Sequence, residues 1–86
     1  MLTLTWTDTG LEDLAWWAKH DAKKLKRIIQ LSLDCCKHPE SGIGKPEPLR
    51  YEFSGFWSRR IDQEHRLVYA FDKQSITIIQ CRFHYD

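Results

Sequence analysis

The second half of the chain holds side chains that together suit the cleavage of RNA without a cofactor. RNA carries its own nucleophile, the 2′-hydroxyl, so a catalyst must remove that proton, protonate the leaving 5′-oxygen and stabilise the charge that develops on phosphorus. A carboxylate or a histidine suits the proton transfers. Arginine suits the phosphate, because its planar fork binds two oxygens and stays charged. Glu47, His84, Arg66 and Arg60 provide one complete set.

Each of these residues also has an ordinary structural role open to it. Glu47 lies between Pro46 and Pro48, which is typical of an exposed loop residue. A single histidine such as His84 is most often a surface or capping residue. Adjacent arginines on a short strand commonly form a charged edge that discourages aggregation. Spacing alone does not decide between these roles and catalysis.

The same segment contains two further sets of polar side chains that suggest metal binding. Asp62, Glu64 and His65 suit a metal-dependent nuclease, but their place in a short turn is more typical of hairpin polarity. Cys81 and His84 are two residues, whereas a structural zinc site needs four ligands. We therefore expect no metal and no cofactor, and a nuclease built on Asp62 and Glu64 remains an alternative.

A single small domain is expected to position these side chains. The 86 residues fit one domain spanning residues 1–86, and 42% hydrophobic with 29% charged residues is a globular balance. The net charge of +1 argues against a uniformly basic nucleic-acid clamp. No apolar run is long enough to cross a membrane, the start lacks a signal-peptide pattern, and three cysteines without paired spacing make a poor disulfide framework. We expect a cytoplasmic protein with no membrane contact.

Two helices are predicted to follow a strand at residues 2–7, where β-forming residues alternate. Thr7 or Asp8 can cap the first helix, and Asp21 can cap a second helix over roughly residues 22–37. The apolar stripe of the first helix is predicted to be Leu11, Leu14, Ala15 and Ala18. The apolar stripe of the second helix is predicted to be Leu25, Ile28, Ile29, Leu33 and Cys36.

A change of period after the second helix predicts a sheet. Residues 38–48 contain all three prolines and two glycines, so they are predicted to form a loop. Four strands are then predicted, at residues 49–53, 56–61, 65–71 and 75–83. The short turns between them favour an antiparallel meander. The expected fold is α+β: an N-terminal strand, two helices and a four-stranded antiparallel meander, with the helices on one face and the other face free to bind.

Four motifs occur together in the second half of the chain: KPEPL, SGFWSRRI, EHRLVY and CRFHY. In this order and spacing they resemble the YoeB (Txe) toxin family, a branch of the RelE/ParE toxin superfamily. The resemblance extends over nearly the whole chain, because the predicted strand and two helices also precede these motifs in the family. It rests on the motifs themselves and not on composition or periodicity.

The resemblance implies a RelE-like, microbial-ribonuclease-like fold and a bacterial type II toxin that cleaves messenger RNA in the ribosomal A site. It implies that Glu47 is the general base and His84 the general acid. Arg66 would stabilise the transition state with help from Arg60, and Tyr85 would orient the substrate or stack on a base. Supporting positions are Lys45, Arg50, Arg59 and Glu64. Position 50 is commonly lysine in the family, so the charge is kept here but the contact geometry differs.

The resemblance also implies partners. A YefM/Axe-like antitoxin would neutralise the toxin with a segment that folds on binding, and operator DNA would be contacted through the antitoxin. The ribosome and messenger RNA would be the other partners, and a homodimer is expected. The alternative is a non-catalytic, toxin-like subunit of an antitoxin-containing repressor complex, which would not need Glu47 and His84 together.

Overall fold

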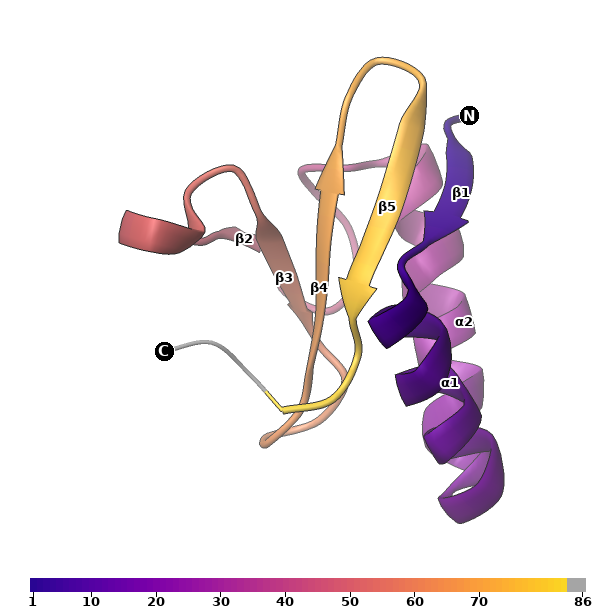
Figure 1. Ribbon diagram of the computed structural model, residues 1–86. Coiled ribbons are helices and arrows are strands. Elements are labelled where there is room, and N and C mark those ends of the chain that lie inside the picture. Colours follow the sequence, from indigo (N-terminus) through magenta and orange to yellow (C-terminus); the bar gives the residue numbers. More distant parts are fainter. Residues whose placement is uncertain (84–86) are drawn as a thin grey trace.

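Two helices lie against one side of a five-stranded sheet in the computed structural model, which describes residues 1–83 (Figure 1). The strands are β1 (Thr3–Trp6), β2 (Glu47–Pro48), β3 (Trp57–Arg60), β4 (Arg66–Phe71) and β5 (Ser75–Gln80). The helices are α1 (Asp8–His20), α2 (Ala22–Lys37) and the short 3₁₀ helix η1 (Tyr51–Phe53). None of the helices within residues 1–83 has the length and apolar character needed to cross a membrane.

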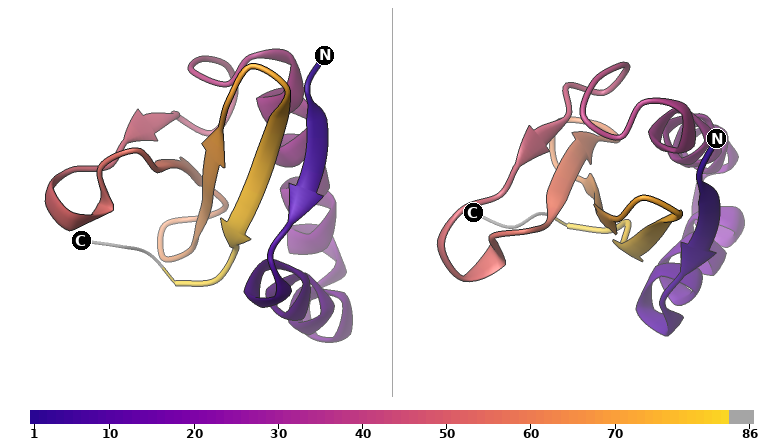
Figure 2. Two further views of the ribbon diagram at one scale, coloured as in Figure 1. Left: turned by 45° about the horizontal axis from the view of Figure 1, so that its top comes forward. Right: turned by 90° about the horizontal axis from the view of Figure 1, so that it is seen from above.

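The sheet is mixed, which corrects the predicted four-stranded antiparallel meander. Its strand order is β1-β5-β4-β3-β2, and β1 runs parallel to β5 while the other neighbours are antiparallel. A parallel pair needs a crossover connection. The α1–α2 pair begins this connection, and it places both helices beside β1 and β5, as the view from above shows (Figure 2).

The segment around η1 is a second correction. The sequence predicts a strand over residues 49–53 and a loop over 38–48, whereas the structure has β2 at Glu47–Pro48 and η1 at Tyr51–Phe53. Tyr51 has a φ of 58°, and a left-handed residue ends an extended run. The last strand is also shorter than predicted, because β5 ends at Gln80 and not at residue 83.

Both predicted helix caps are confirmed. The side-chain oxygen of Thr7 accepts from the N–H of Gly10 at 3.0 Å, and Asp21 accepts from the first N–H groups of α2. The predicted apolar stripe of α1 is right for Leu14, which packs against the core, but wrong for Leu11, Ala15 and Ala18, which are exposed. Gly10 and Trp17 are the buried residues of this helix. Gly10 lies so close to β5 that a Cβ there would stand 2.8 Å from the carbonyl oxygen of Ile78. The close approach at this glycine determines which face of α1 meets the sheet.

The core lies between the helices and one face of the sheet. On α2 the predicted stripe is right for Ile28 and Cys36 but wrong for Ile29 and Leu33, which are exposed. The other fully buried apolar side chains that pack in this core include Leu31, Cys35, Leu67, Tyr69, Ile76, Ile78 and Cys81. Side chains of alternate strand residues therefore face the helices, and the intervening residues face the other way.

Arg59 is the largest fully buried side chain, and it belongs to the helix-facing side of β3. Its guanidinium donates to Asp34 of α2, to the hydroxyl of Tyr69 and to three carbonyl oxygens of the loop that follows α2. These five hydrogen bonds use every N–H that an arginine side chain has. The carbonyls belong to His38, Ser41 and Ile43.

This buried arginine organises the loop that leads to β2. Tyr69, which accepts from Arg59, donates in turn to the carbonyl of Pro39 at 2.7 Å. At the end of the loop the N–H of Arg60 donates to the carbonyl of Gly44 at 2.7 Å. Gly44 has a φ of 80°, in the region that glycine adopts without a steric penalty. Hydrogen bonds thereby hold the loop near both of its ends, at Pro39 and at Gly44. Glu47 lies three residues after Gly44.

We expect Arg59→Met to lower the free energy of unfolding by about 3 kcal/mol, because it leaves Asp34 and buried carbonyls without their donor. The matched control is Arg60→Met, which replaces the exposed neighbour on the other face of the same strand and should change stability by less than about 0.5 kcal/mol. Urea unfolding of the two variants measures the difference. Equal midpoints would show that Arg59 does not hold the loop.

Candidate active site

The face of the sheet that points away from the helices carries three of the predicted site residues. Glu47 of β2 lies opposite Ser58 of β3, and Arg60 of β3 lies opposite Arg66 of β4. Paired residues share a face, and Ser58 and Arg60 share one because they are two apart on a strand. Glu47, Arg60 and Arg66 therefore project from the same surface, while Arg59 projects into the core.

The register also sets the spacing of these residues. Glu47 and Arg66 are separated by two strand spacings across the sheet and by two residues along it. With strands about 4.8 Å apart and a rise of about 3.3 Å per residue, their Cα atoms stand roughly 12 Å apart. Side chains as long as glutamate and arginine can reach a phosphodiester group placed between these two positions.

Glu47 is exposed at the free edge of the sheet. The Nζ of Lys45 lies 3.5 Å from its carboxylate oxygen Oε1, and both side chains are more than half exposed. Lys45 itself has a φ of 54°, so the chain enters β2 through a left-handed residue. An exposed carboxylate beside a cation is accessible to a substrate from solution, and the pair is worth little for stability.

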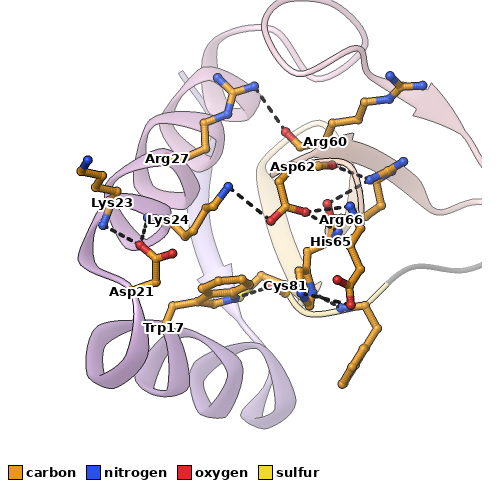
Figure 3. Close-up of polar contacts among 12 residues, drawn as sticks. Trp17, Asp21, Lys23, Lys24, Arg27, Arg60, Asp62, His65, Arg66 and Cys81 are labelled. Atoms are coloured by element: carbon orange, nitrogen blue, oxygen red, sulfur yellow. Dashed lines mark hydrogen bonds and ion pairs between the residues drawn. The ribbon is translucent and has the colours of Figure 1, made fainter.

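Arg66 is held in place through one of its guanidinium nitrogens. Its Nη1 donates to the carbonyl oxygens of Asp62 at 2.8 Å and His65 at 3.1 Å, and these contacts are drawn in Figure 3. Within residues 1–83 its Nε and Nη2 make no hydrogen bond. The turn therefore orients the guanidinium while leaving N–H donors for an anion.

The turn that holds Arg66 is itself tied to α2. Asp62 accepts from the backbone N–H groups of Glu64 and His65, and its other oxygen lies 3.3 Å from the Nζ of Lys24. Burial raises the pKa of Asp62, but these hydrogen bonds and the lysine charge outweigh it and keep the pKa below its usual value. The Asp62 carboxylate thus has a structural role, which argues against the alternative of a metal nuclease built on Asp62 and Glu64.

The remaining predicted residues lie around this surface. Arg60 is exposed and points away from α2, and its carbonyl accepts from Nη2 of Arg27 at 3.3 Å (Figure 3). Arg50 is exposed at the residue before η1, which projects from the far edge of the sheet (Figure 2). Glu64 is exposed, and its carboxylate lies 3.7 Å from Nε2 of His65. Within residues 1–83 no three His, Cys, Asp or Glu side chains form a group that could hold a metal ion.

Arg59 does not belong to this surface, although the sequence predicts it as a supporting residue for RNA. Its side chain is fully buried and its five donors are engaged by the protein. The adjacent arginines therefore divide their roles, because successive strand residues face opposite sides of the sheet. The predicted general acid His84 and the predicted stacking residue Tyr85 lie outside the described residues.

The sequence interpretation missed the contacts by which α1 holds the segment after β5. Asp13 accepts from the N–H of Cys81 at 3.0 Å, and Nε1 of Trp17 donates to the carbonyl of Cys81 at 2.7 Å. Trp16 stacks against Arg82, whose guanidinium carbon lies 3.9 Å from the ring centroid. The spacing of Asp13, Trp16 and Trp17 places them on one helix face, and this spacing was the available signal.

The sequence and the fold are similar to those of known proteins. Residues 6–85 match the family described as YoeB-like toxin of bacterial type II toxin-antitoxin system. The toxin YoeB of Streptomyces coelicolor is 48% identical over 98% of this chain and 100% of its own length. The YoeB/ParE toxin structure from Agrobacterium tumefaciens has a TM-score of 0.92 at 42% identity, covering 98% of this chain and 100% of that one.

Two structures from Staphylococcus aureus are also similar. A YoeB dimer has a TM-score of 0.89 at 39% identity, covering 98% of each chain, and a YoeB–YefM complex has a TM-score of 0.87 at 37% identity, covering 99% of each. With the family match spanning nearly the whole sequence and full-length relatives above 40% identity, the chain belongs to the YoeB-like toxins of bacterial type II toxin–antitoxin systems.

Proposed function

We propose that this toxin is an endoribonuclease that cleaves messenger RNA in the ribosomal A site by metal-free acid–base catalysis. One observation carries the proposal: a carboxylate and two arginines, Glu47, Arg60 and Arg66, project from one face of the sheet. A base beside two cations suits attack by the 2′-hydroxyl on the adjacent phosphorus. The membership of the YoeB family supports the same chemistry.

Each side chain has a distinct part in the proposed reaction. Glu47 removes the proton of the 2′-hydroxyl, and the oxygen attacks phosphorus to give a 2′,3′-cyclic phosphate. Arg66 binds the equatorial phosphate oxygens through the donors that the turn leaves available, and Arg60 adds a second positive charge. His84 protonates the leaving 5′-oxygen, and Tyr85 stacks on a base. Lys45, Arg50 and Glu64 border the surface, where they contact the RNA backbone or hold neighbouring side chains of the site in place.

Solved structures of relatives support the partners that we propose for this toxin. The Staphylococcus aureus structures contain a YoeB dimer and a YoeB–YefM complex. We propose a YefM/Axe-like antitoxin and a homodimer for this chain as well, with operator DNA contacted through the antitoxin. The ribosome and its messenger RNA are the proposed targets in the bacterial cytoplasm.

A non-catalytic subunit of a repressor complex is the second candidate function. It would explain the fold and the antitoxin partner but not why Glu47 and Arg66 face the same open surface. The two candidates differ in a measurable way, because only the nuclease loses its effect on growth when the carboxylate is neutralised.

The test of the proposed function is cleavage of messenger RNA on programmed ribosomes by Glu47→Gln. We expect this variant to cleave about 10²–10⁴-fold more slowly than the unaltered protein, because it cannot accept the 2′-hydroxyl proton. The matched control is Glu52→Gln, which neutralises an exposed carboxylate in η1 and should cleave at the original rate.

The chemistry of the products provides the decisive readout. Attack by the 2′-hydroxyl leaves a 5′-hydroxyl end, and a 2′-deoxynucleotide at the cleaved position should abolish the reaction. Products with 5′-phosphate ends would point to attack by water and to a metal-dependent nuclease. Absence of cleavage by the unaltered protein would favour the repressor subunit.

Arg66 is expected to act on the charge of the transition state. Arg66→Ala should lose most single-turnover cleavage, by about 10²-fold or more, because a preorganised donor to the developing charge is removed. Arg66→Lys should recover part of the rate, since it restores one charge but not the planar fork. Circular dichroism of each variant checks that the fold persists. Full activity of Arg66→Ala would remove this residue from the mechanism.

His84 is expected to act as the general acid. His84→Ala should slow single-turnover cleavage by about 10²–10⁴-fold, because the 5′-oxygen then leaves as an unprotonated alkoxide. Replacing the 5′-bridging oxygen of the RNA with sulfur should remove most of this defect, because a thiolate leaves without a proton. An undiminished defect on the sulfur substrate would mean that His84 positions the RNA and is not the acid.

A further inference from the structure

Phe83 is the last described residue, and its backbone is held in an unusual conformation. Its φ is 61°, in the left-handed region that is rare for residues other than glycine. Two hydrogen bonds hold it there: its N–H donates to Nδ1 of His65 at 2.8 Å, and its carbonyl accepts from the N–H of Arg66 at 2.7 Å. Such a conformation persists when the surrounding structure determines it.

The hydrogen bond from the Phe83 N–H indicates which nitrogen of the neutral His65 ring carries the proton. A backbone N–H can only donate, so Nδ1 of His65 carries the lone pair and the neutral ring carries its proton on Nε2. Nε2 faces the carboxylate of Glu64 at 3.7 Å. The ring also meets the indole of Trp17 edge-on, with centroids 4.9 Å apart. Helix α1 and the turn after β3 therefore both fix the imidazole that receives the Phe83 N–H.

Stacking of the Arg82 side chain also helps to hold Phe83 in this position. The guanidinium carbon of Arg82 lies over the ring of Trp16, 3.9 Å from its centroid, and over the ring of Phe83, 4.8 Å from its centroid. Its Nε is buried without a hydrogen-bond partner among residues 1–83, so stacking and not hydrogen bonding at Nε holds this part of the side chain. The segment after β5 is thus anchored before Phe83 by α1 and at Phe83 by His65.

We propose that His65 is a positioning residue for the general acid. His84 follows Phe83 directly in the sequence, so the dihedral angles of Phe83 set the direction in which the chain leaves toward it. Nδ1 of His65 fixes those angles, and the neighbouring Arg66 N–H ties the same residue to the strand that carries the phosphate-binding arginine. One backbone unit, that of Phe83, therefore links the segment that precedes His84 to the strand that carries Arg66. This inference rests on the proposed role of His84.

Two substitutions separate the hydrogen bond from the packing of the ring. His65→Asn keeps an acceptor oxygen at the position of Nδ1 but loses the ring that packs on Trp17. His65→Leu keeps apolar bulk against Trp17 but loses the acceptor. The side chain is 12% exposed, so the leucine variant is expected to be the more stable and the asparagine variant the more active.

The first measurement does not depend on activity. The ¹⁵N–¹H signal of the Phe83 amide should show hydrogen-bond protection in the unaltered protein and in His65→Asn, and should lose it in His65→Leu. An unchanged Phe83 amide in His65→Leu would overturn the proposal whether or not the protein cleaves RNA.

The second measurement is a double-mutant cycle in single-turnover cleavage on ribosomes. We expect His65→Leu to slow cleavage about 10²-fold, the size of effect that a displacement near 1 Å produces, and His65→Asn to slow it by less. In the His84→Ala background His65→Leu should add nothing, because the group it positions is absent. Defects that multiply, or a leucine variant more active than the asparagine variant, would show that His65 only supports the fold. Loss of the unaltered protein's own cleavage would instead refute the proposed function.

Discussion

The buried guanidinium of Arg59 is the interaction on which the rest of the site depends. A charge in the core is costly unless it is paired and fully hydrogen-bonded, and here all five donors are engaged. Burial raises the pKa of Asp34, but the hydrogen bonds from Arg59 and the backbone of Ile43, together with the charge of Arg59, outweigh this effect and leave the pKa below its usual value. The carboxylate therefore stays ionised as the partner of Arg59. Three of the acceptors are loop carbonyls, so the arginine orders the chain that delivers Glu47 to the sheet.

Helix α2 supports the part of the proposed site that contains Glu47 and Arg66, and helix α1 supports the segment that leads to the proposed acid. Asp34 on α2 binds Arg59, which supports the carboxylate side, and Lys24 on the same helix binds the turn that orients Arg66. Helix α1 holds the segment that leads to His84 through Trp17 and its neighbours. Because the α1–α2 pair lies between β1 and the rest of the sheet in sequence, one crossover supplies both supports. Its helices contact the sheet on the face opposite the proposed substrate surface.

Local chemistry predicted much of this fold, and long-range pairing accounts for most of what it did not predict. The caps Thr7 and Asp21 and the strands β4 and β5 follow from side chains close in sequence. The parallel pairing of β1 with β5 joins residues more than 70 positions apart, and no local pattern reports it. The same applies to Arg59 and Arg60, since adjacent arginines look alike until the register says which one faces the core. Motifs brought Glu47, Arg60 and Arg66 to attention, but only the register places them on one surface.

The left-handed backbone conformations among the described non-glycine residues occur at or next to proposed site residues in the sequence. Its described residues other than glycine with positive φ are Lys45, Tyr51 and Phe83. Each is itself a proposed site residue or directly adjoins one, and each such conformation costs of order 1–3 kcal/mol. Lysine, tyrosine and phenylalanine have no preference for the left-handed region, so the residue types at these positions do not predict a positive φ. Tertiary contacts hold two of them: Arg59 binds the loop before Lys45, and Nδ1 of His65 accepts a hydrogen bond from the N–H of Phe83. Because one of these contacts comes from the core arginine and the other from the ring packed on Trp17, the backbone leading to Glu47 and the backbone leading to His84 are both coupled to the packing of the fold.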